Sequence, residues 1–341
     1  MYSFNNDYSE GAHPDIMEAL MRTNMEQTGG YSLDTYTEEA IHNMKNLINC
    51  QNADIHLLVG GTQTNLTALS AFLRPHHAII AASTAHIAVH ETGAIEATGH
   101  KVIIHPTDDG KLNVNHIREC YEAHTDEHMV KPKLVYISNP TELGTIYSKA
   151  ELEEISCYCK ENQLFLYLDG ARMASALTAI GNDIALSDYA KYTDAFYIGG
   201  TKSGALFGEA LVICNDNLKE DFRYHIKQKG GMLAKGRLLA IQFNTLFTNH
   251  LYETLGEHSN KMAYKLKEGI TSLGYRFLVD SQTNQQFPIF PNNVIIQLEK
   301  EFLFSFQAKI DENHSAIRLV TSWATREDKV EKFIEVLRNC K

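Results

Sequence analysis

The sequence predicts an α/β fold, with a mostly parallel seven-stranded sheet in a large domain and a smaller C-terminal α+β domain. The first observation is that short apolar segments alternate with helical patterns between residues 55 and 214. This alternation is typical of a parallel sheet that helices cover on both faces. The second observation is size, because 341 residues with 44% hydrophobic composition suffice for one large core and a smaller one.

Seven short apolar segments are the predicted strands of the large sheet. They lie at 55–59, 78–82, 101–104, 134–137, 165–168, 195–198 and 210–214. The spacing of apolar residues predicts helices at 15–25, 37–50, 65–73, 86–98, 114–124 and 149–162. Ligands bind such sheets beyond the carboxyl ends of the strands, so the functional site is expected there.

The chain is expected to divide into an arm (1–14), a large domain (15–245) and a small domain (246–341). The arm is polar and aromatic. The small domain begins in a long helical pattern that ends near Leu273. Short strands are then predicted at 275–279, 293–298, 302–307 and 316–320, before a closing helix at 326–339.

Charge and cysteine content restrict the class of protein. The net charge of −11 argues against a nucleic-acid or anionic-membrane partner. The six cysteines are scattered without metal-binding spacing, which is typical of reduced thiols in the cytoplasm and predicts no metal site. The first residues show neither a signal peptide nor a transmembrane segment. A cytoplasmic protein that acts on a small molecule is the expectation.

The candidate reactive group is Lys202, which lies in the stretch D-A-F-Y-I-G-G-T-K-S-G-A-L-F at 194–207. A lysine just beyond a buried strand is poorly solvated, so its neutral amine is favoured. A neutral amine is a nucleophile toward aldehydes. A lone lysine in a glycine-rich loop is more often simply solvated, and the interpretation therefore depends on the other motifs.

The strongest local motif is Y-L-D-G-A-R-M-A at 167–174, where Asp169 ends a buried strand. A buried carboxylate needs a partner, because an uncompensated charge is costly to bury. A protonated pyridine nitrogen is such a partner. An aldehyde-binding lysine and a strand-end carboxylate are the two groups that pyridoxal 5'-phosphate (PLP) most needs, so Lys202 and Asp169 together predict this cofactor.

Two further motifs follow the first two predicted strands. In V-G-G-T-Q-T-N, Gly60 and Gly61 free backbone N–H groups at a helix start and Thr62 adds a hydroxyl, which is suited to a phosphate. In A-H-I-A-V-H-E-T-G-A, His86 is placed to lie flat on a cofactor ring and to reach a substrate hydroxyl, and Glu91 to reach the same cleft. An ordinary turn, a helix cap and a solvated helix face are the respective alternatives.

Candidate substrate-binding residues come from three places in the chain. Arg172 offers a planar fork suited to a carboxylate, and Arg318 in H-S-A-I-R-L-V offers a second one. Asn139 and Thr141 in I-S-N-P-T-E are expected over the cleft. Structural ion pairs for the arginines, and a simple turn at N-P-T, remain the alternatives.

Together these motifs resemble the fold-type I PLP enzymes, and within them the low-specificity L-threonine aldolase group of the aromatic amino acid β-eliminating lyase family. The resemblance covers nearly the whole chain. G-G-T-Q-T-N looks like the family's phosphate-binding S-G-T-x-A-N, A-H-I…E-x-G-A like its segment with a ring-stacking histidine, L-D-G-A-R like its pyridine- and carboxylate-binding segment, and K-G-G-M-L-A-K-G (229–236) like G-G-G-M-R-Q-A-G.

The resemblance implies further site residues. Ala171 falls in the cofactor-binding segment, Tyr36 where the family lends a tyrosine to the neighbouring subunit, and Lys229 (or Lys227) where a lysine reaches the neighbour's phosphate. A homo-oligomer, dimer or tetramer, follows from this resemblance. N-N-D at 5–7 looks like the family's R-S-D, with Asn6 in place of a carboxylate-binding serine.

The chain departs from the family where substrate is bound. Thr141 stands in place of a histidine that contacts the β-hydroxyl, and S-K-G-L-G-A-P-V-G becomes T-K-S-G-A-L-F-G. The implied activity is cleavage of L-threonine, L-allo-threonine or related β-hydroxy-α-amino acids to glycine and an aldehyde. The base remains open between His86, a water held by Glu91 and His86, and a phosphate-linked water. Another PLP reaction (β-elimination, racemisation or transamination) and a catalytically silent binding protein are the competing interpretations.

Overall fold

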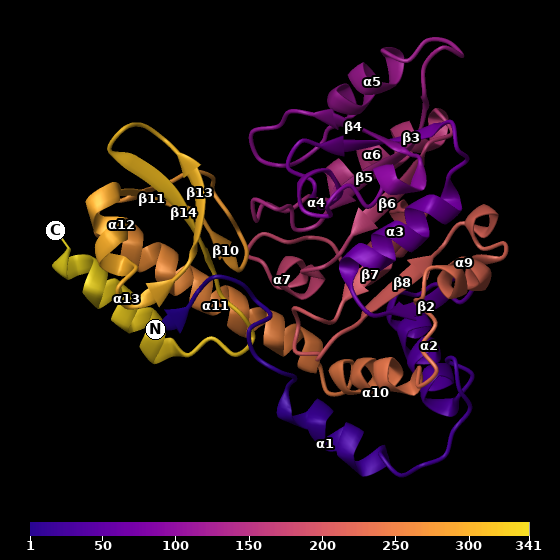
Figure 1. The fold of residues 1–341 in the computed structure, drawn as a ribbon, viewed down its shortest axis with the longest axis horizontal. Coiled ribbons are helices and arrows are strands. Elements are labelled where there is room, and N and C mark those ends of the chain that lie inside the picture. The colour runs from indigo at the N-terminus through magenta and orange to yellow at the C-terminus, as the bar shows by residue number, and fades with distance from the viewer. Residues whose placement is uncertain (341) are drawn as a thin grey trace.

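The computed structural model describes residues 1–340, and a seven-stranded sheet forms its centre (Figure 1). Its order is β2 (Asp54–Leu58), β8 (Glu209–Ile213), β7 (Ala195–Gly199), β6 (Phe165–Asp169), β5 (Lys131–Ser138), β3 (His77–Ala82) and β4 (Lys101–His105). The pairs from β7 to β4 are parallel, whereas β8 is antiparallel to both of its neighbours. The predicted mostly parallel seven-stranded sheet is confirmed.

Two apolar cores cover the two faces of this sheet. Adjacent residues of one strand point to opposite cores, as Ile79 and Ile80 do in β3, because side chains alternate along a strand. One core includes side chains from α2 (Thr35–Leu47), α5 (Val114–Glu122), α6 (Lys149–Glu161), α8 (Leu186–Tyr192) and α10 (Arg237–Leu246). The other includes α3 (Gly61–Phe72), α4 (His86–Val89) and α9 (Phe222–Gln228). Burial on both faces explains why the strands are continuous apolar runs.

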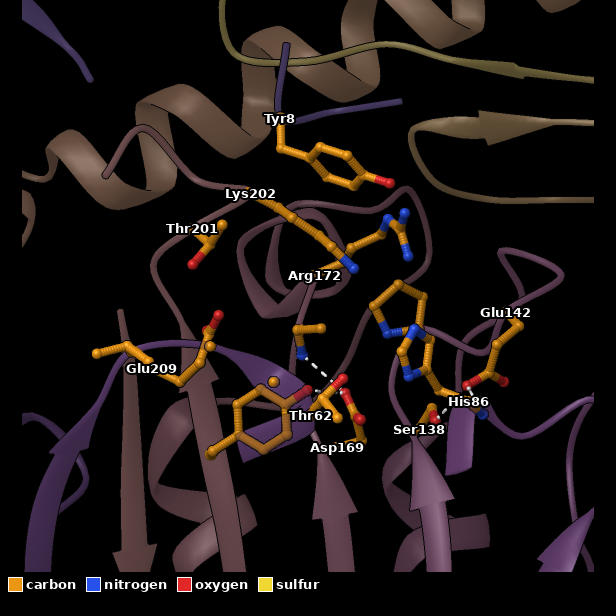
Figure 2. A pocket seen from close by; sticks show the side chains of 16 residues that line it. Tyr8, Thr62, His86, Ser138, Glu142, Asp169, Arg172, Thr201, Lys202 and Glu209 are labelled. Carbon is orange, nitrogen blue, oxygen red and sulfur yellow. Dashed lines mark hydrogen bonds between the residues drawn. The ribbon is translucent and has the colours of Figure 1, made fainter. Parts of the chain in front are cut away.

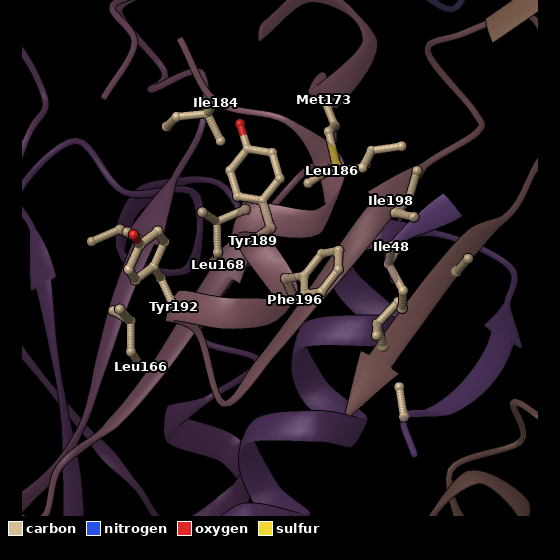
Figure 3. Close-up of a cluster of buried hydrophobic side chains, with 14 of the residues drawn as sticks. Ile48, Leu166, Leu168, Met173, Ile184, Leu186, Tyr189, Tyr192, Phe196 and Ile198 are labelled. Carbon is tan, nitrogen blue, oxygen red and sulfur yellow. The ribbon is translucent and has the colours of Figure 1, made fainter. Parts of the chain in front are cut away.

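Part of the first core lies beneath β6 and β7 (Figure 3). Leu166 and Leu168 of β6 and Phe196 of β7 pack with Tyr189 of α8 and with Met173 of α7 (Met173–Leu177). These side chains are all buried. The packing holds the ends of β6 and β7 rigidly, and the motifs that follow these two strands start from those ends.

The C-terminal part forms a second sheet with its own core (Figure 1). The long helix α11 (Leu251–Ser272) leads into it. The sheet contains β9 (Arg276–Phe277), β10 (Gln285–Gln286), β11 (Pro288–Pro291), β13 (Ser305–Lys309) and β14 (His314–Val320), and α13 (Glu327–Asn339) packs on α11. The predicted smaller α+β domain is therefore present.

The N-terminal arm belongs to this second unit by its contacts. β1 (Tyr2–Ser3) pairs in parallel with β12 (Phe302–Leu303), and Phe4 is fully buried in the small core. The chain then crosses toward the large sheet and enters α1 (Pro14–Thr23). Because Asn5 to His13 run between the two units, the arm brings side chains to the boundary between them. Within residues 1–340 no helix is long and apolar enough to cross a membrane.

Two secondary-structure predictions were wrong. Residues 293–298 form helix α12 (Asn292–Leu298) instead of a strand, because Val294 and Leu298 bury the same helical face four residues apart. The predicted helix at 86–98 stops at Val89, and only a short 3₁₀ turn at Glu96–Thr98 follows. Positive φ angles of 54° at Thr92 and 70° at Gly93 interrupt the helical path there.

Candidate active site

A cavity of about 230 Å³ lies beyond the carboxyl ends of the central strands (Figure 2). It is lined by Tyr8, Val59, Gly60, Gly61, Thr62, His86, Ser138, Pro140, Glu142, Asp169, Ala171, Arg172, Tyr197, Thr201, Lys202 and Glu209. Lys202 and Asp169 both line this one cavity, with Tyr8 above Lys202. The site lies at the sheet edge where the topology predicts it.

Asp169, at the end of β6, is buried and accepts four hydrogen bonds. Its Oδ1 accepts from the Tyr197 hydroxyl at 2.6 Å and from the Ala171 N–H at 3.0 Å. Its Oδ2 accepts from the Tyr136 hydroxyl at 2.5 Å and from Asn65 Nδ2 at 3.2 Å. The carboxyl group is thus surrounded by donors, which favour its ionised form.

The balance of burial and donors leaves Asp169 charged. Burial acts to raise the pKa of this carboxyl, but the electrostatic interaction with His86 and the hydrogen bonds from the Tyr136 and Tyr197 hydroxyls outweigh it. The pKa of Asp169 therefore lies below its ordinary value. The same burial, together with the Asp169 charge, keeps the pKa values of both tyrosines well above their ordinary value, so they stay protonated donors.

Lys202 lies in the tight loop between β7 and β8. The N–H groups of Gly200 and Thr201 both donate to the carbonyl oxygen of Gly208, at 2.9 and 3.1 Å. A Cβ atom on Gly200 would lie 2.8 Å from that oxygen, so the loop closes only with glycine there. Burial lowers the pKa of Lys202, and the neighbouring Arg172 lowers it further. The lowered pKa favours the neutral, nucleophilic amine that the sequence predicts.

The start of α3 faces the same cavity. Gly60 precedes the helix in extended conformation, and no side chain caps the first turn. Gly61 lies against the Tyr197 hydroxyl, 3.0 Å from where a Cβ atom would be, so a larger residue would crowd this wall. Thr62 adds a hydroxyl to the lining. Backbone N–H groups that no side chain caps at a helix start are suited to a phosphate. The Lys202 amine, the Asp169 carboxylate and this anion site therefore fit PLP together.

His86 is oriented by a buried carboxylate. Its Nδ1 lies 2.8 Å from Oε1 of Glu91, which is 5% exposed and also accepts from Asn65 Nδ2 at 2.8 Å. Asn65 in turn donates to Asp169. Glu91, Asn65 and Asp169 therefore form one hydrogen-bonded chain under the cavity, in which Glu91 supports His86 and does not itself line the cavity.

The two predicted arginines have different surroundings. Arg172 donates to the buried carboxylate of Asp7 from Nε at 2.7 Å and from Nη2 at 3.1 Å. Arg318 donates only weakly to the Asn5 carbonyl at 3.4 Å, and its Nε is buried without a partner within residues 1–340. Burial and the nearby Arg172 charge lower the pKa of Arg318. Arg318 lines a second cavity of about 450 Å³ that adjoins the first.

Besides Glu91, four predicted site residues lie outside both cavities. Asn6 accepts from the Tyr8 N–H at 3.0 Å, and Thr141 is buried 2.7 Å from the Thr145 hydroxyl. Tyr36 lines a separate cavity, with its hydroxyl 2.5 Å from Glu26. Lys229 follows the end of α9, away from the cavity lining. Thr141 is therefore not over the cleft, because the turn after β5 points it toward the Asp109 carbonyl instead.

The structure adds lining residues that the sequence interpretation missed. Glu142 accepts from the His86 N–H at 2.9 Å and from Ser138 Oγ at 2.8 Å, and burial and the Asp169 charge raise its pKa. Burial raises the pKa of Glu209 to about 8. Glu142 directly follows Thr141, at which the chain departs from the family pattern, so this departure marked the segment that contains Glu142. Tyr136 and Tyr197 had no such signal, because a tyrosine within an apolar strand looks like an ordinary core residue.

Comparison with known proteins identifies the family of the chain. The β-eliminating lyase family model matches residues 7–292. The low specificity L-threonine aldolase of Pseudomonas aeruginosa is 30% identical over 98% of this chain and 96% of that protein. A solved structure of Leishmania major threonine aldolase is 50% identical, with a TM-score of 0.98 and 99% of each chain covered.

A more distant likeness concerns the fold alone. A mutant aspartate aminotransferase from Thermus thermophilus has a TM-score of 0.76 at 15% identity, with 99% of this chain and 96% of that chain covered. The fold-type I architecture is thereby confirmed. From the family match over most of its length and the full-length relatives, the chain belongs to the β-eliminating lyase family, as a PLP-dependent lyase akin to the threonine aldolases.

Proposed function

We propose that this protein cleaves threonine, allo-threonine and related β-hydroxy-α-amino acids between Cα and Cβ, releasing glycine and an aldehyde. The observation that carries the proposal is that the Lys202 amine and the Asp169 carboxylate line one cavity with Arg172. The names of the threonine aldolases from Pseudomonas aeruginosa and Leishmania major support this reaction.

The residues around the first cavity would hold PLP. Lys202 would bind its aldehyde carbon covalently and Asp169 its ring nitrogen, while His86 and Ala171 would contact the ring. Gly60, Gly61 and Thr62 would hold the phosphate at the start of α3. When bound, PLP supplies a cationic ring that accepts the electron pair released at Cα.

Arg172 and Arg318 would bind the substrate carboxylate. Both line the second cavity, which also contains the Lys202 side chain. Arg318 carries the unpartnered donor, so it offers the stronger new contact, whereas Arg172 shares its fork with Asp7. A carboxylate held between two guanidinium groups has its Cα fixed relative to the lysine, which is how positioning accelerates a bond cleavage.

We infer that His86 takes the proton of the β-hydroxyl group. Its Nδ1 is bonded to Glu91, which leaves Nε2 for the substrate. Glu91 would hold the ring in place and stabilise it when it becomes charged. Lys202 would protonate Cα, which completes glycine, because its amine lines the same cavity and, once protonated, releases its proton readily at a lowered pKa.

We also propose a cytoplasmic homo-oligomer. Tyr36 and Lys229 lie away from the cavity of their own chain, which agrees with roles in a second copy. The six cysteines are all free, as expected of a reducing compartment. Size-exclusion chromatography with light scattering tests the assembly, and a monomer that is fully active would contradict it.

The product profile tests the proposed reaction. The PLP-loaded enzyme is incubated with L-threonine, L-allo-threonine, L-serine and L-cysteine, and glycine, aldehyde, 2-oxo acids and ammonia are measured. Glycine and acetaldehyde in equal amounts from threonine or allo-threonine are expected. Release of 2-oxo acid and ammonia without glycine would assign the protein to β-elimination, and an exchange of the amino group to transamination. The unloaded protein is the control.

A further inference from the structure

The second cavity is larger than threonine requires. It measures about 450 Å³ and shares Tyr8, His86, Glu142, Arg172 and Lys202 with the cofactor cavity. Its other lining residues are Ser83, Thr84, Val89, His90, Leu143, Gln285, Gln307 and Arg318. Most of these side chains are polar. A substrate whose carboxylate contacts Arg318 therefore has ample, mainly polar space left for its β-substituent, while threonine would fill it with one methyl group.

Gln285 lines this cavity and has a side-chain acceptor without a partner among the described residues. In the small sheet it pairs with Val320, which places it on the same face as Arg318 two residues away. Its side-chain Nε2 donates to the Glu142 carbonyl oxygen at 3.4 Å. Oε1 is left buried and without a hydrogen-bond partner within residues 1–340, although the residue is only 1% exposed. A buried acceptor in this state needs a donor.

The neighbouring groups limit which kind of donor can pair with Oε1 of Gln285. The Glu142 carboxyl group is a second acceptor on the same wall, and the buried Thr84 hydroxyl also lacks a partner. An ammonium group would satisfy the acceptors, but the cavity is already lined by the guanidinium groups of Arg172 and Arg318, which repel a further cation. A hydroxyl group is a neutral donor that can meet this need without adding a positive charge.

We propose that the second cavity binds the β-substituent of the substrate and selects one that carries a hydroxyl group, with Gln285 as its specificity-determining acceptor. The favoured substrates are then β,γ-dihydroxy-α-amino acids, and the aldehyde released is an α-hydroxyaldehyde. The inference rests on the proposed cleavage. In that reaction the Cα–Cβ bond breaks, the β-hydroxyl group loses its proton and Cα gains one, so no co-reactant is needed.

A pair of substrates of equal size tests the inference on the unaltered enzyme. 4-Hydroxythreonine and 3-hydroxynorvaline differ only by a hydroxyl group in place of a terminal methyl group. We expect kcat/KM to be roughly ten-fold higher for 4-hydroxythreonine, the worth of one good hydrogen bond. Equal values, or a preference for 3-hydroxynorvaline, would overturn the inference.

A pair of variants assigns the preference to Gln285. In Gln285→Leu the ratio of the two kcat/KM values should fall to about one. Gln286→Leu is the matched control, because Gln286 is the adjacent residue of β10, is equally buried and bonds to the Thr283 carbonyl instead of lining the cavity. Its ratio should stay at the wild-type value. Loss of the preference in Gln286→Leu but not in Gln285→Leu would contradict the assignment.

Two further measurements separate this inference from the proposed function. Threonine is assayed in the same experiment, so glycine release from threonine with no discrimination between the paired substrates refutes only the hydroxyl subsite. Absence of glycine from all three substrates refutes the cleavage itself. Calorimetric binding of the same pair to a Lys202→Ala protein, which cannot react, should reproduce the preference without turnover, and equal affinities there would also count against the subsite.

Discussion

Arg172 forms a bidentate ion pair with the buried carboxylate of Asp7, 165 positions away in the sequence. Asp7 also accepts from Asn284 Nδ2 at 2.9 Å, so the pair joins the N-terminal arm, the large sheet and the small domain. Burial acts to raise the pKa of Asp7, but the Arg172 charge and the hydrogen bonds bring it below its ordinary value of 3.8. A substrate carboxylate that approaches Arg172 therefore meets a guanidinium group that is already compensated.

Asp7→Asn should destabilise the protein. Removing one partner of a buried pair leaves the other charge uncompensated, which costs about 3–5 kcal/mol. Urea unfolding at neutral pH measures this loss, with the exposed Asp108→Asn as the control. Because the folded pKa of Asp7 is lowered, its contribution is present above pH 3.8 and is lost as the pH falls further. The gap between wild type and Asp7→Asn should narrow in acid, and a gap that widens there would contradict the pairing.

Lys202→Ala should abolish turnover and the covalent retention of PLP. Loss of a covalent nucleophile costs on the order of 10⁶ in kcat, because no other described lysine lines the cofactor cavity. Dialysis followed by a visible absorbance scan measures cofactor retention, and glycine release measures turnover. The exposed Lys300→Ala should match wild type in both. Normal turnover in Lys202→Ala would remove the basis of the mechanism.

His86→Phe and Glu91→Gln should both lower kcat, but by different factors. The phenyl ring keeps the packing of His86 but cannot take a proton, so kcat should fall about 10²- to 10⁴-fold. Glu91→Gln retains a hydrogen bond to the ring and loses only its charge assistance, worth roughly ten-fold. Steady-state kinetics with threonine measures both. If Glu91→Gln proved the more damaging variant, the role of His86 as base would be contradicted.

Glu209→Gln should change how stability depends on pH. Burial raises the pKa of Glu209 from 4.5 to about 8, so the folded state holds this proton more tightly than the unfolded state. The resulting contribution is full below pH 4.5 and is lost as the pH rises through about 8. The unfolding free energy of wild type relative to Glu209→Gln should therefore decrease between these pH values. Denaturant unfolding at several pH values measures it, and parallel pH curves for the two proteins would show that Glu209 is not perturbed.

The sequence predicted those parts of the fold that depend on neighbouring residues, and it failed where packing between distant residues decides the structure. Apolar runs such as Ala195–Ile198 indicate a strand that is buried on both faces of a sheet, and this pattern is visible within a few neighbouring residues. The segment 293–298 was misread because V-I-I favours strands locally, whereas its packing in the small core is helical. Local propensity is a weak signal in such short segments, and tertiary packing overrides it.

By itself the sequence determined the sheet, the edge at which the candidate site lies, and two of the residues that line its cavity, Lys202 and Asp169. Each of these follows a strand end, and parallel strand ends meet at one edge. Only the tertiary structure decided that Asp7 occupies Arg172, that Tyr136 donates to Asp169, and that Gln285 reaches the Glu142 carbonyl. These contacts join residues from different elements and domains. Their geometry is set by strand register and domain packing, which no local pattern of residues encodes.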